Sequence, residues 1–512
     1  MTRPCSLLSL TGLFALLAYL SVFAGSLNHI ADDPGIGWHL QNGEQIAQSR
    51  EIPYVDQFLA RARVENSFAP VGEGRAWVSD QWLSDLIFHG LFRAGGWPAL
   101  YALVAGLFLI AYFGIAADGL RRAGQGSVIV LLAVVCAFKM GQVHMIVRPV
   151  IFSLVLFPYV LRRVDTLVGR SDVSWKEIRR ESFLLIPLFI LWANLHPAFV
   201  YGLLVIAIGV IAKLIRDIRG GVRIGVLLLT CSLSTLVNPY GFTLHGSIVQ
   251  LGGSDYLRSM TIEWSGVDLS RPEGILLLIL SGIPLCAFMI SRDVRRRVGG
   301  FEILVASVFL IQALWAVRIL PFASFACLPL WAACFGSLRI VPSSSCAMLT
   351  SRVFSAATER ECRLVAPGLL ASCTFAMVGA IVMVASPARV LPQELAPSLE
   401  IRLAKIFEQV HVNHASGVIF ASLNWGGAIT HLLGERFKPV LDDRTVLVGE
   451  VLYRAYGQSL HNPNVFEDLV KVFGVTHAFV PTAVPLERYL ASNGSWTQIY
   501  SGEEVVVFAA LP

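Results

Sequence analysis

Long apolar runs separated by short polar segments fill most of the chain up to residue 386. A membrane-spanning helix needs roughly 20 apolar residues, so the pattern predicts about eleven transmembrane helices. The pairs 126–143/150–161 and 182–195/198–214 include shorter runs, where we expect helices that stop short around a water-filled recess. The apolar runs lie near residues 7–27, 97–117, 126–143, 150–161, 182–195, 198–214, 224–237, 273–290, 301–317, 321–338 and 364–385.

The first apolar run, Leu7 to Leu27, follows a single basic residue, Arg3. A cleaved signal peptide is one interpretation, because Val22-Phe23-Ala24 forms an acceptable cleavage site. The run is long enough to span the bilayer, which favours a retained helix with the N-terminus in the cytoplasm.

The basic residues between the apolar runs fall in every second loop. Cytoplasmic loops carry an excess of Lys and Arg, so this alternation places the N-terminus inside. With an odd number of helices, the C-terminal region then lies outside. The loops are those with Arg121-Arg122; with Arg162-Arg163, Arg170, Lys176, Arg179 and Arg180; with Lys213, Arg216, Arg219 and Arg223; with Arg292 and Arg295-Arg296-Arg297; and with Arg339, Arg352, Arg360 and Arg363.

Composition agrees with a polytopic membrane protein. The hydrophobic fraction is 55% and the charged fraction 15%, whereas a soluble domain has about a quarter of its residues charged. The net charge of +5 is small, and the basic residues cluster in the short loops between apolar runs, where they determine membrane topology. A nucleic-acid partner is therefore not expected. None of the nine cysteines falls in the long polar regions 28–95 and 387–512. We therefore expect no disulfides there, and no structural zinc site.

Residues 402–512 predict a small extracytoplasmic α/β domain, which a linker at 387–401 joins to a transmembrane module at 1–386. Strands that alternate with helices favour a mostly parallel sheet. The glycines at 417 and 426–427 are too loosely spaced for a dinucleotide fingerprint. The expected strands are Gly417–Phe420, Lys438–Leu441, His477–Val480 and Val505–Phe508, and the expected helices end near Leu433 or lie near 447–457, 464–473 and 485–492.

Polar residues that could bind a charged or hydroxylated ligand collect on the predicted outer side. Ionisable residues near membrane depth are by default functional candidates. Simpler roles remain open for each: a helix cap for the two adjacent aspartates, lipid contacts for the arginines and packing for the histidine at 196. The outer residues are Asp32, Asp33, Trp38, His39 and Asp56 in the first outer loop (28–95), then Arg148, Asn194, His196, Glu263 and Arg318.

At these residues the chain resembles the GT-C membrane glycosyltransferases, and among them bacterial multi-pass proteins with an outer C-terminal domain. The resemblance covers most of the chain. It rests on Asp32-Asp33 through Trp38-His39-Leu40, Gly43, Ile52-Pro53, Asp56, Trp82-Leu83, Arg148-Pro149, Trp192-Ala193-Asn194-Leu195-His196, Asn238-Pro239-Tyr240-Gly241, Glu263-Trp264, Trp425-Gly426-Gly427 and Asp442-Asp443-Arg444.

The resemblance implies a catalytic base at Asp32 or Asp33 and a polyprenyl-phosphate-linked sugar as donor. The acceptor would be a cell-envelope glycan, lipid or protein at the outer face of the bacterial cytoplasmic membrane. A carboxylate can take the proton of an acceptor hydroxyl, and Arg148 or Arg318 could stabilise the leaving phosphate. A divalent ion held with Asp56 or Glu263 stays open as a cofactor.

Two other classes of function stay open. A transporter or flippase of lipid-linked glycans would bind a similar ligand without reaction, but would show paired half-helices in both halves of the chain. The short pairs here lie only in the first half. A non-catalytic assembly protein would use the outer α/β domain to recruit partners of a surface-polysaccharide pathway. Within that domain, Asp442-Asp443-Arg444 is expected to form an internal ion pair.

Overall fold

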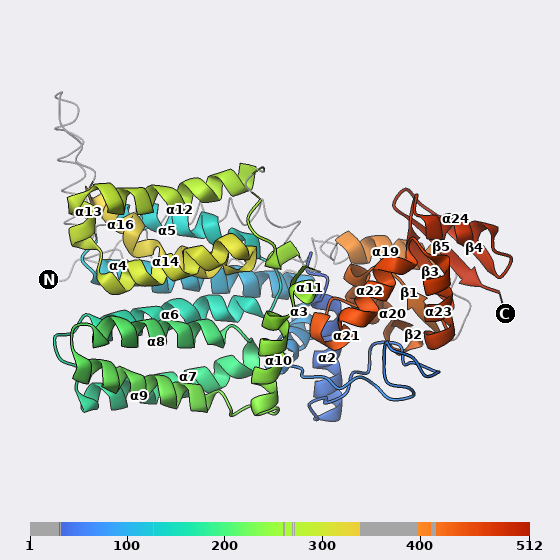
Figure 1. The fold of residues 1–512 in the computed structure, drawn as a ribbon, viewed down its shortest axis with the longest axis horizontal. Coiled ribbons are helices and arrows are strands. Elements are labelled where there is room, and N and C mark those ends of the chain that lie inside the picture. The colour runs from blue at the N-terminus through green and yellow to red at the C-terminus, as the bar shows by residue number, and fades with distance from the viewer. Residues whose placement is uncertain are drawn as a thin grey trace, which may run out of the picture. The chain divides into compact units, whose positions relative to one another are not determined.

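Helices make up most of the structure up to residue 337, and a mixed α/β region follows near the C-terminus (Figure 1). The computed structural model describes residues 30, 32–125, 127–259, 262–268, 270, 272–337, 398–410 and 416–511. The chain forms two units. Unit 1 comprises Met1–Ile30, Tyr101–Asn238 and Ile262–Pro387, and unit 2 comprises Ala31–Leu100, Pro239–Thr261 and Ala388–Pro512.

Unit 1 is built from helices joined by short turns. Helix α8 packs against α6 and α9, and α7 packs against α9 (Figure 1). Between α6 and α14, the ring of Phe157 lies 5.1 Å from the ring of Phe309, in an edge-to-face contact typical of aromatic cores. The helices are α3 (Trp82–Phe108, which begins in unit 2), η1 (Leu109–Ala116), α4 (Ala117–Arg122), α5 (Ser127–Gly141), η2 (Gln142–His144), α6 (Val150–Val168), α7 (Trp175–Leu195), α8 (Phe199–Leu214), α9 (Ile218–Ser234), η3 (Ile262–Trp264), α12 (Pro272–Ile290), α13 (Arg292–Arg297), α14 (Gly300–Trp315), η4 (Val317–Ile319), α15 (Leu320–Ala326) and α16 (Leu328–Ser337).

Helices α6 and α7 are longer than their apolar runs. They have 19 and 21 residues, so the expectation that the runs 150–161 and 182–195 mark truncated helices is wrong. Charged residues extend both helices, and Arg163 of α6 pairs with the buried Glu181 of α7. That pairing lets polar residues remain helical beyond the apolar run. Helices α5 and α8 are shorter, at 15 and 16 residues.

The number of membrane spans stays a prediction. Among the described residues, one helical segment, Trp82–Leu120, is long and apolar enough to cross a membrane by itself. The number of such segments rises to two if the helices Val317–Ala326 and Leu328–Ser337, which meet at a 50° bend, are counted as one span. The expected single helix at 321–338 is therefore broken. The runs at 7–27 and 364–385 lie outside the described residues.

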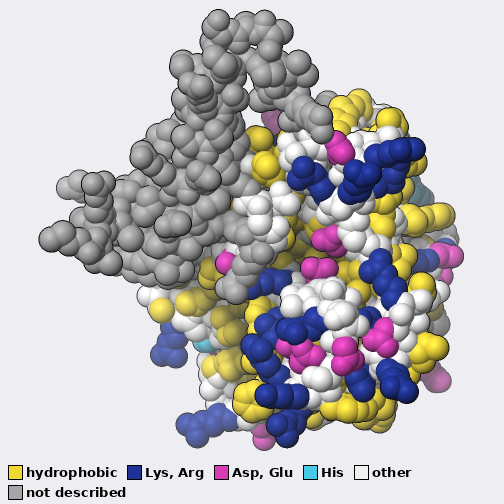
Figure 2. All heavy atoms as spheres, turned by 90° about the vertical axis from the view of Figure 1, so that its left-hand side faces the viewer, with side chains coloured by type: hydrophobic (Ala, Val, Ile, Leu, Met, Phe, Trp, Pro, Cys, Tyr) yellow, Lys and Arg dark blue, Asp and Glu magenta, His cyan; other side chains and the backbone are white. Residues whose placement is uncertain are grey.

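The basic loops meet at one end of the unit 1 helices. Arg162 in the second half of α6 pairs with Asp118 of α4, and Arg223 of α9 pairs with Asp172 in the loop between α6 and α7. Figure 2 shows Lys and Arg side chains gathered on this face. The arrangement agrees with the alternation of charge along the sequence, while the side of the membrane stays a prediction.

Unit 2 has a five-stranded mixed sheet of order β2-β1-β3-β5-β4. The pairs β1–β2 and β1–β3 are parallel, and β3–β5 and β4–β5 are antiparallel. The expectation of a mostly parallel sheet is therefore wrong. The connection between β4 and β5 is too short for a crossover and permits only antiparallel pairing. The strands are β1 (Gly417–Phe420), β2 (Phe437–Pro439), β3 (His477–Pro481), β4 (Trp496–Ser501) and β5 (Val505–Ala510).

Helices cover both faces of this sheet. Alternate residues of β1 point to opposite sides, so that Phe420 packs with Phe466 of α23 and Ile419 packs with Leu403 of α19. Because α19 begins at Ser398, the last residues of the expected linker at 387–401 belong to the folded domain. The remaining elements of unit 2 are α2 (Ile36–Ser49), α10 (Phe242–Gly253), α11 (Asp255–Ser259), α19 (Ser398–Val410), η5 (Leu423–Trp425), α20 (Gly426–Leu433), η6 (Gly434–Arg436), α21 (Thr445–Val448), α22 (Glu450–Ser459), α23 (Pro463–Phe473) and α24 (Pro485–Ser492).

Lys213 should stabilise the basic end of unit 1. Its buried ammonium donates to the backbone oxygens of Arg170 at 2.6 Å and Ser171 at 3.3 Å, joining α8 to the loop between α6 and α7. We expect Lys213→Met to lower the apparent melting temperature in detergent by several degrees, because a charged donor worth about 2 kcal/mol is lost. Lys176→Met, at an exposed position, is the control and should leave it unchanged. Equal melting temperatures in the two variants would contradict this role.

Candidate functional site

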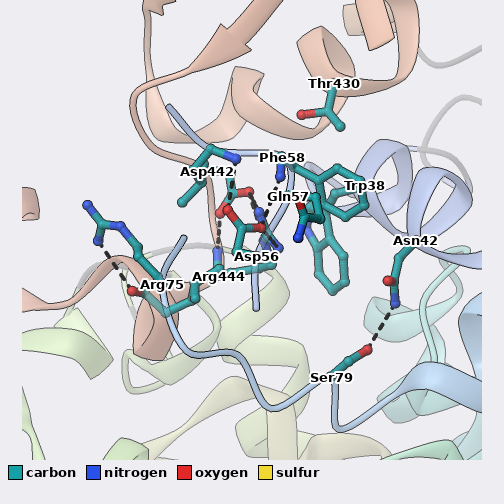
Figure 3. Close-up of polar contacts among 12 residues, drawn as sticks. Trp38, Asn42, Asp56, Gln57, Phe58, Arg75, Ser79, Thr430, Asp442 and Arg444 are labelled. Carbon is teal, nitrogen blue, oxygen red and sulfur yellow. Dashed lines mark hydrogen bonds and ion pairs between the residues drawn. The ribbon is translucent and has the colours of Figure 1, made fainter. Parts of the chain in front are cut away.

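The guanidinium of Arg444 is buried in unit 2 between two carboxylates (Figure 3). It donates to Oδ2 of Asp442 from Nε at 2.8 Å and from Nη2 at 2.6 Å, and to Oδ1 of Asp56 from Nη1 at 2.7 Å. Asp442 follows β2, whereas Asp56 lies in the segment between α2 and α3. The expected internal ion pair of Asp442 and Arg444 is therefore present, and Asp56 is its third member.

Aromatic rings enclose this ion-pair cluster. The Arg444 guanidinium lies 5.3 Å from the ring centre of Trp38, 5.4 Å from that of Phe58 and 4.6 Å from that of Trp77. Burial alone would lower the pKa of Arg444, but Asp442 and Asp56 outweigh burial and raise it. Arg444 therefore stays charged. Asp56 accepts hydrogen bonds from Arg444 and from the backbone N–H of Leu59, the latter at 2.8 Å.

A second buried polar network fixes α2 on the start of α3. Nδ1 of His39 lies 2.5 Å from Oδ1 of Asp85. The amide of Asn42 donates to Oδ2 of Asp85 at 2.6 Å and to Oγ of Ser79 at 2.9 Å. All four side chains are buried. His39, expected as a substrate ligand, thus contacts an acidic side chain, Asp85.

The two adjacent aspartates before α2 differ in exposure. Asp32 is exposed, whereas Asp33 is only 4% exposed. Oδ1 of Asp33 accepts a hydrogen bond from the backbone N–H of Gly35 at 3.4 Å. Gly35 itself holds the N-cap position of α2. Neither carboxylate therefore fills the capping position that Asp often takes, and Asp32 is the one presented to solvent.

In unit 1, cationic side chains converge where α5 and α14 end. Arg148, which precedes α6, forms an ion pair with Glu263 of η3. The guanidinium of Arg318 in η4 lies 4.3 Å from the ring centre of Trp264. Burial would raise the pKa of Glu263, but Arg148, His144 and Arg318 together lower it to about 2. Three of the expected ligands are therefore close enough to share one electrostatic environment.

The other two expected ligands of unit 1 take part in packing. The amide of Asn194 donates to the backbone oxygens of Ile190 and Val237, which ties the end of α7 to the segment after α9. Nδ1 of His196 lies 3.0 Å from Oγ of Ser153, which also accepts a hydrogen bond from Trp192. Both expected ligands are buried. Their contacts favour the packing role over substrate binding.

A metal ion does not fit the two carboxylates that the sequence left open as its ligands. Asp56 faces the Arg444 guanidinium and Glu263 faces Arg148. Within the described ranges, no group of three or more His, Cys, Asp or Glu side chains has a metal-binding arrangement. We therefore assign no metal role to Asp56 or Glu263.

Three further residues of these clusters, Asp85, Ser79 and His144, lacked an assigned role at the sequence level. Asp85 carries a readable signal, because it is a carboxylate in the first turn of a long apolar helix. His144 is buried beside Arg148, Glu263 and Arg318. Nothing in its flanking sequence marks it.

Comparison with known proteins does not identify a family. No family model matches the chain, and no curated protein matches it. The chain is similar to the crystal structure of ArnT from Cupriavidus metallidurans in the apo state, with 14% sequence identity over 97% of either chain and a TM-score of 0.42. A likeness at this level does not establish function.

Removal of Arg444 should destabilise unit 2 strongly. In Arg444→Leu, the carboxylates of Asp56 and Asp442 stay buried without their cation, a loss of about 3–5 kcal/mol. We expect a large fall in the apparent melting temperature, followed in detergent by the fluorescence of Trp38 and Trp77 near the cluster.

The control is Arg402→Leu, which removes an exposed ion pair with Glu504 and should cost about 0–1 kcal/mol. Combining Arg444→Leu with Asp56→Asn and Asp442→Asn should recover part of the loss. A melting temperature for Arg444→Leu as high as that of Arg402→Leu would show that the buried cluster contributes little.

Proposed function

We propose that the chain is an integral membrane glycosyltransferase. It transfers a sugar from a polyprenyl-phosphate-linked donor to a cell-envelope glycan, lipid or protein acceptor at the outer face of the bacterial cytoplasmic membrane. The observation that carries the proposal is the cationic cluster of Arg148 and Arg318 in the turns of unit 1, which matches the charge of a lipid phosphate.

The surface of the unit 1 helices supports a membrane location. Soluble monomers rarely expose contiguous apolar patches of more than a few hundred Å², yet large apolar side chains stand outward along most of these helices. They belong to α7, α8, α9, α12 and α14 and include Phe183, Leu191, Ile211, Leu229, Leu233, Ile279, Ile283, Ile311 and Leu314.

The cationic cluster lies at the end of unit 1 away from the basic loops. Arg148 precedes the first residue of α6, whereas Arg162 and Arg163 lie in the second half of that helix. An α-helix rises about 1.5 Å per residue, so the 14 or 15 residues between Arg148 and these arginines separate them by about 20 Å along α6. If the basic loops face the cytoplasm, the cluster lies toward the outer leaflet, where a lipid-linked donor would be used.

The charges of the cluster suit a departing phosphate. The guanidiniums of Arg148 and Arg318 both act on the carboxylate of Glu263 and lower its pKa, so both lie in reach of one anionic group. Arg recognises phosphate oxygens through paired N–H donors. Fixed cations of this kind stabilise the charge that develops on a leaving phosphate.

The base is assigned to Asp32 or Asp33, and exposure favours Asp32. A base must come within hydrogen-bond reach of the acceptor hydroxyl, and Asp32 is exposed whereas Asp33 is buried in the turn before α2. The acceptor oxygen bonds to the anomeric carbon as the bond from that carbon to the phosphate oxygen breaks. The hydroxyl proton passes to the carboxylate, and polyprenyl phosphate leaves. Displacement in one step inverts the anomeric centre.

Sugar transfer should depend on one of the two aspartates. We expect membranes that carry Asp32→Asn to lose about 100-fold or more of the transfer of labelled sugar from total polyprenyl-phosphate donors, because the general base is gone. Asp33→Asn should retain more activity, since its carboxylate lies in the turn. The control is Asp468→Asn at an exposed position in α23.

Transfer at wild-type level in both variants, with equal expression, would remove the carboxylates from catalysis. Loss of sugar transfer in Asp33→Asn alone would identify Asp33 as the base. Absence of transfer by the wild type would instead favour a transporter or an assembly protein.

The arginines of unit 1 should act on donor binding. We expect Arg318→Gln to raise the KM for the lipid-linked donor about 10–100-fold, the equivalent of one charge-assisted hydrogen bond of about 1.5–3 kcal/mol. Arg436→Gln, at an exposed position in unit 2, should leave KM unchanged. An unaltered donor KM in Arg318→Gln would contradict phosphate binding at this cluster.

A further inference from the structure

We propose that the C-terminal α/β domain positions the chain's own acidic stretch, Asp32-Asp33, and that Gly427, Trp38 and Asp443 are the residues through which it does so. The inference rests on the proposed function, in which that stretch supplies the base. It assigns to the α/β domain a role inside the catalytic unit, separate from recruitment of partners.

The contact uses the edge of the sheet where α/β proteins usually bind ligands. In open α/β sheets, the crevice outside the carboxyl ends of parallel strands is the common ligand site. Here β1 leads into the turn Leu423–Trp425 and α20, and β2 leads into Asp442-Asp443-Arg444. Helix α2 packs against α20 at this edge. The chain's own N-terminal segment thus takes the place of a ligand.

Two glycines allow the backbones to approach closely. A Cβ atom added to Gly37 would lie 2.1 Å from the carbonyl oxygen of Gly427, and one added to Gly427 would lie 2.2 Å from the carbonyl oxygen of Pro34. Both obstructing atoms belong to the backbone, so no side-chain rotation can relieve the clash. Any larger residue at either position must separate α20 from the turn that follows Asp33.

One side-chain hydrogen bond joins α2 to the segment that follows β2. Nε1 of Trp38 donates to Oδ1 of Asp443 at 2.9 Å. Oδ2 of Asp443 lies near Gly35, where an added Cβ would come within 2.9 Å of it. The turn between Asp33 and Trp38 is therefore held against the residue that follows Asp442.

The two buried polar networks hold both partners of the contact. Arg444 joins the segment of Asp443 to Asp56, and the pair of His39 and Asp85 fixes α2 to α3. Because α2 is held on one side by α3 and on the other by α20, its first turn has little freedom to move. Displacement of a catalytic base by about 1 Å can lower the reaction rate about 100-fold. The fixed position of the first turn of α2 therefore affects catalysis directly.

The first test measures the position of the segment without any assay of activity. Hydrogen–deuterium exchange of the full chain in detergent is compared between Gly427→Ala and Gly457→Ala. Gly457 lies in α22 of the same domain, and an added Cβ there meets nothing within 4 Å. We expect amides of residues 35–40 to exchange at least about tenfold faster in Gly427→Ala only, because the first turn of α2 is released. Equal exchange in the two variants overturns the inference.

The second test is a double-mutant cycle on sugar transfer. Trp38→Phe keeps an aromatic ring but loses the Nε1 donor, so we expect kcat to fall about tenfold with donor KM within twofold of the wild type. In an Asp32→Asn background, the same substitution should have no further effect, because a positioning residue acts only through the base that it positions. A fall in kcat that is equally large in both backgrounds indicates a general structural role and overturns the inference.

The two tests separate the inference from the proposed function. If the wild type transfers no sugar, the proposed function fails while the exchange measurement still decides whether the α/β domain fixes the acidic stretch. If Gly427→Ala does not fold, hydrogen–deuterium exchange is measured in Trp38→Phe instead. Faster exchange of residues 35–40 in that variant supports the inference, and unchanged exchange overturns it.

Discussion

The ion-pair cluster of Arg444, Asp56 and Asp442 is the constraint on which unit 2 depends. A buried guanidinium is tolerated only when carboxylates and further hydrogen bonds compensate for lost hydration, so the segment before α3 and the segment after β2 must meet. Asp56 and Arg444 are 388 positions apart in the chain. This requirement makes the first polar segment and the C-terminal α/β domain one folded unit, and it places Trp38 and Asp443 within hydrogen-bond distance.

Local pattern predicted most elements, and the misses have physical causes. The strands near 417–420, 477–480 and 505–508 are present because their apolar residues alternate between two covered faces. Strand β4 lies at the sheet edge and leaves Thr497 and Gln498 exposed, so it lacks an apolar signature. Helices α6 and α7 were predicted too short, because Arg163 and Glu181 look like loop residues until their pairing is known.

The residue types of the candidate site could be predicted from the sequence, but the pairing of its charged side chains could not. Charged side chains near membrane depth are energetically costly and are therefore functional candidates. On this basis the sequence points to Asp32, Asp33, Arg148, Glu263 and Arg318. Which charges compensate one another depends on contacts between distant segments, which a single sequence does not encode in any local pattern. For this reason Asp56 was expected to bind substrate, although it is the partner of Arg444.

The most direct test of a glycosyltransferase is the fate of the lipid-linked donor. Purified chain in proteoliposomes is supplied with a polyprenyl-phosphate sugar labelled in both the lipid and the sugar, together with a membrane extract as the source of acceptor. We expect one polyprenyl phosphate to be released for each sugar transferred, and this release to be lost in Asp32→Asn. Donor that reaches the opposite leaflet intact, with no lipid phosphate released, would contradict the account and indicate a transporter.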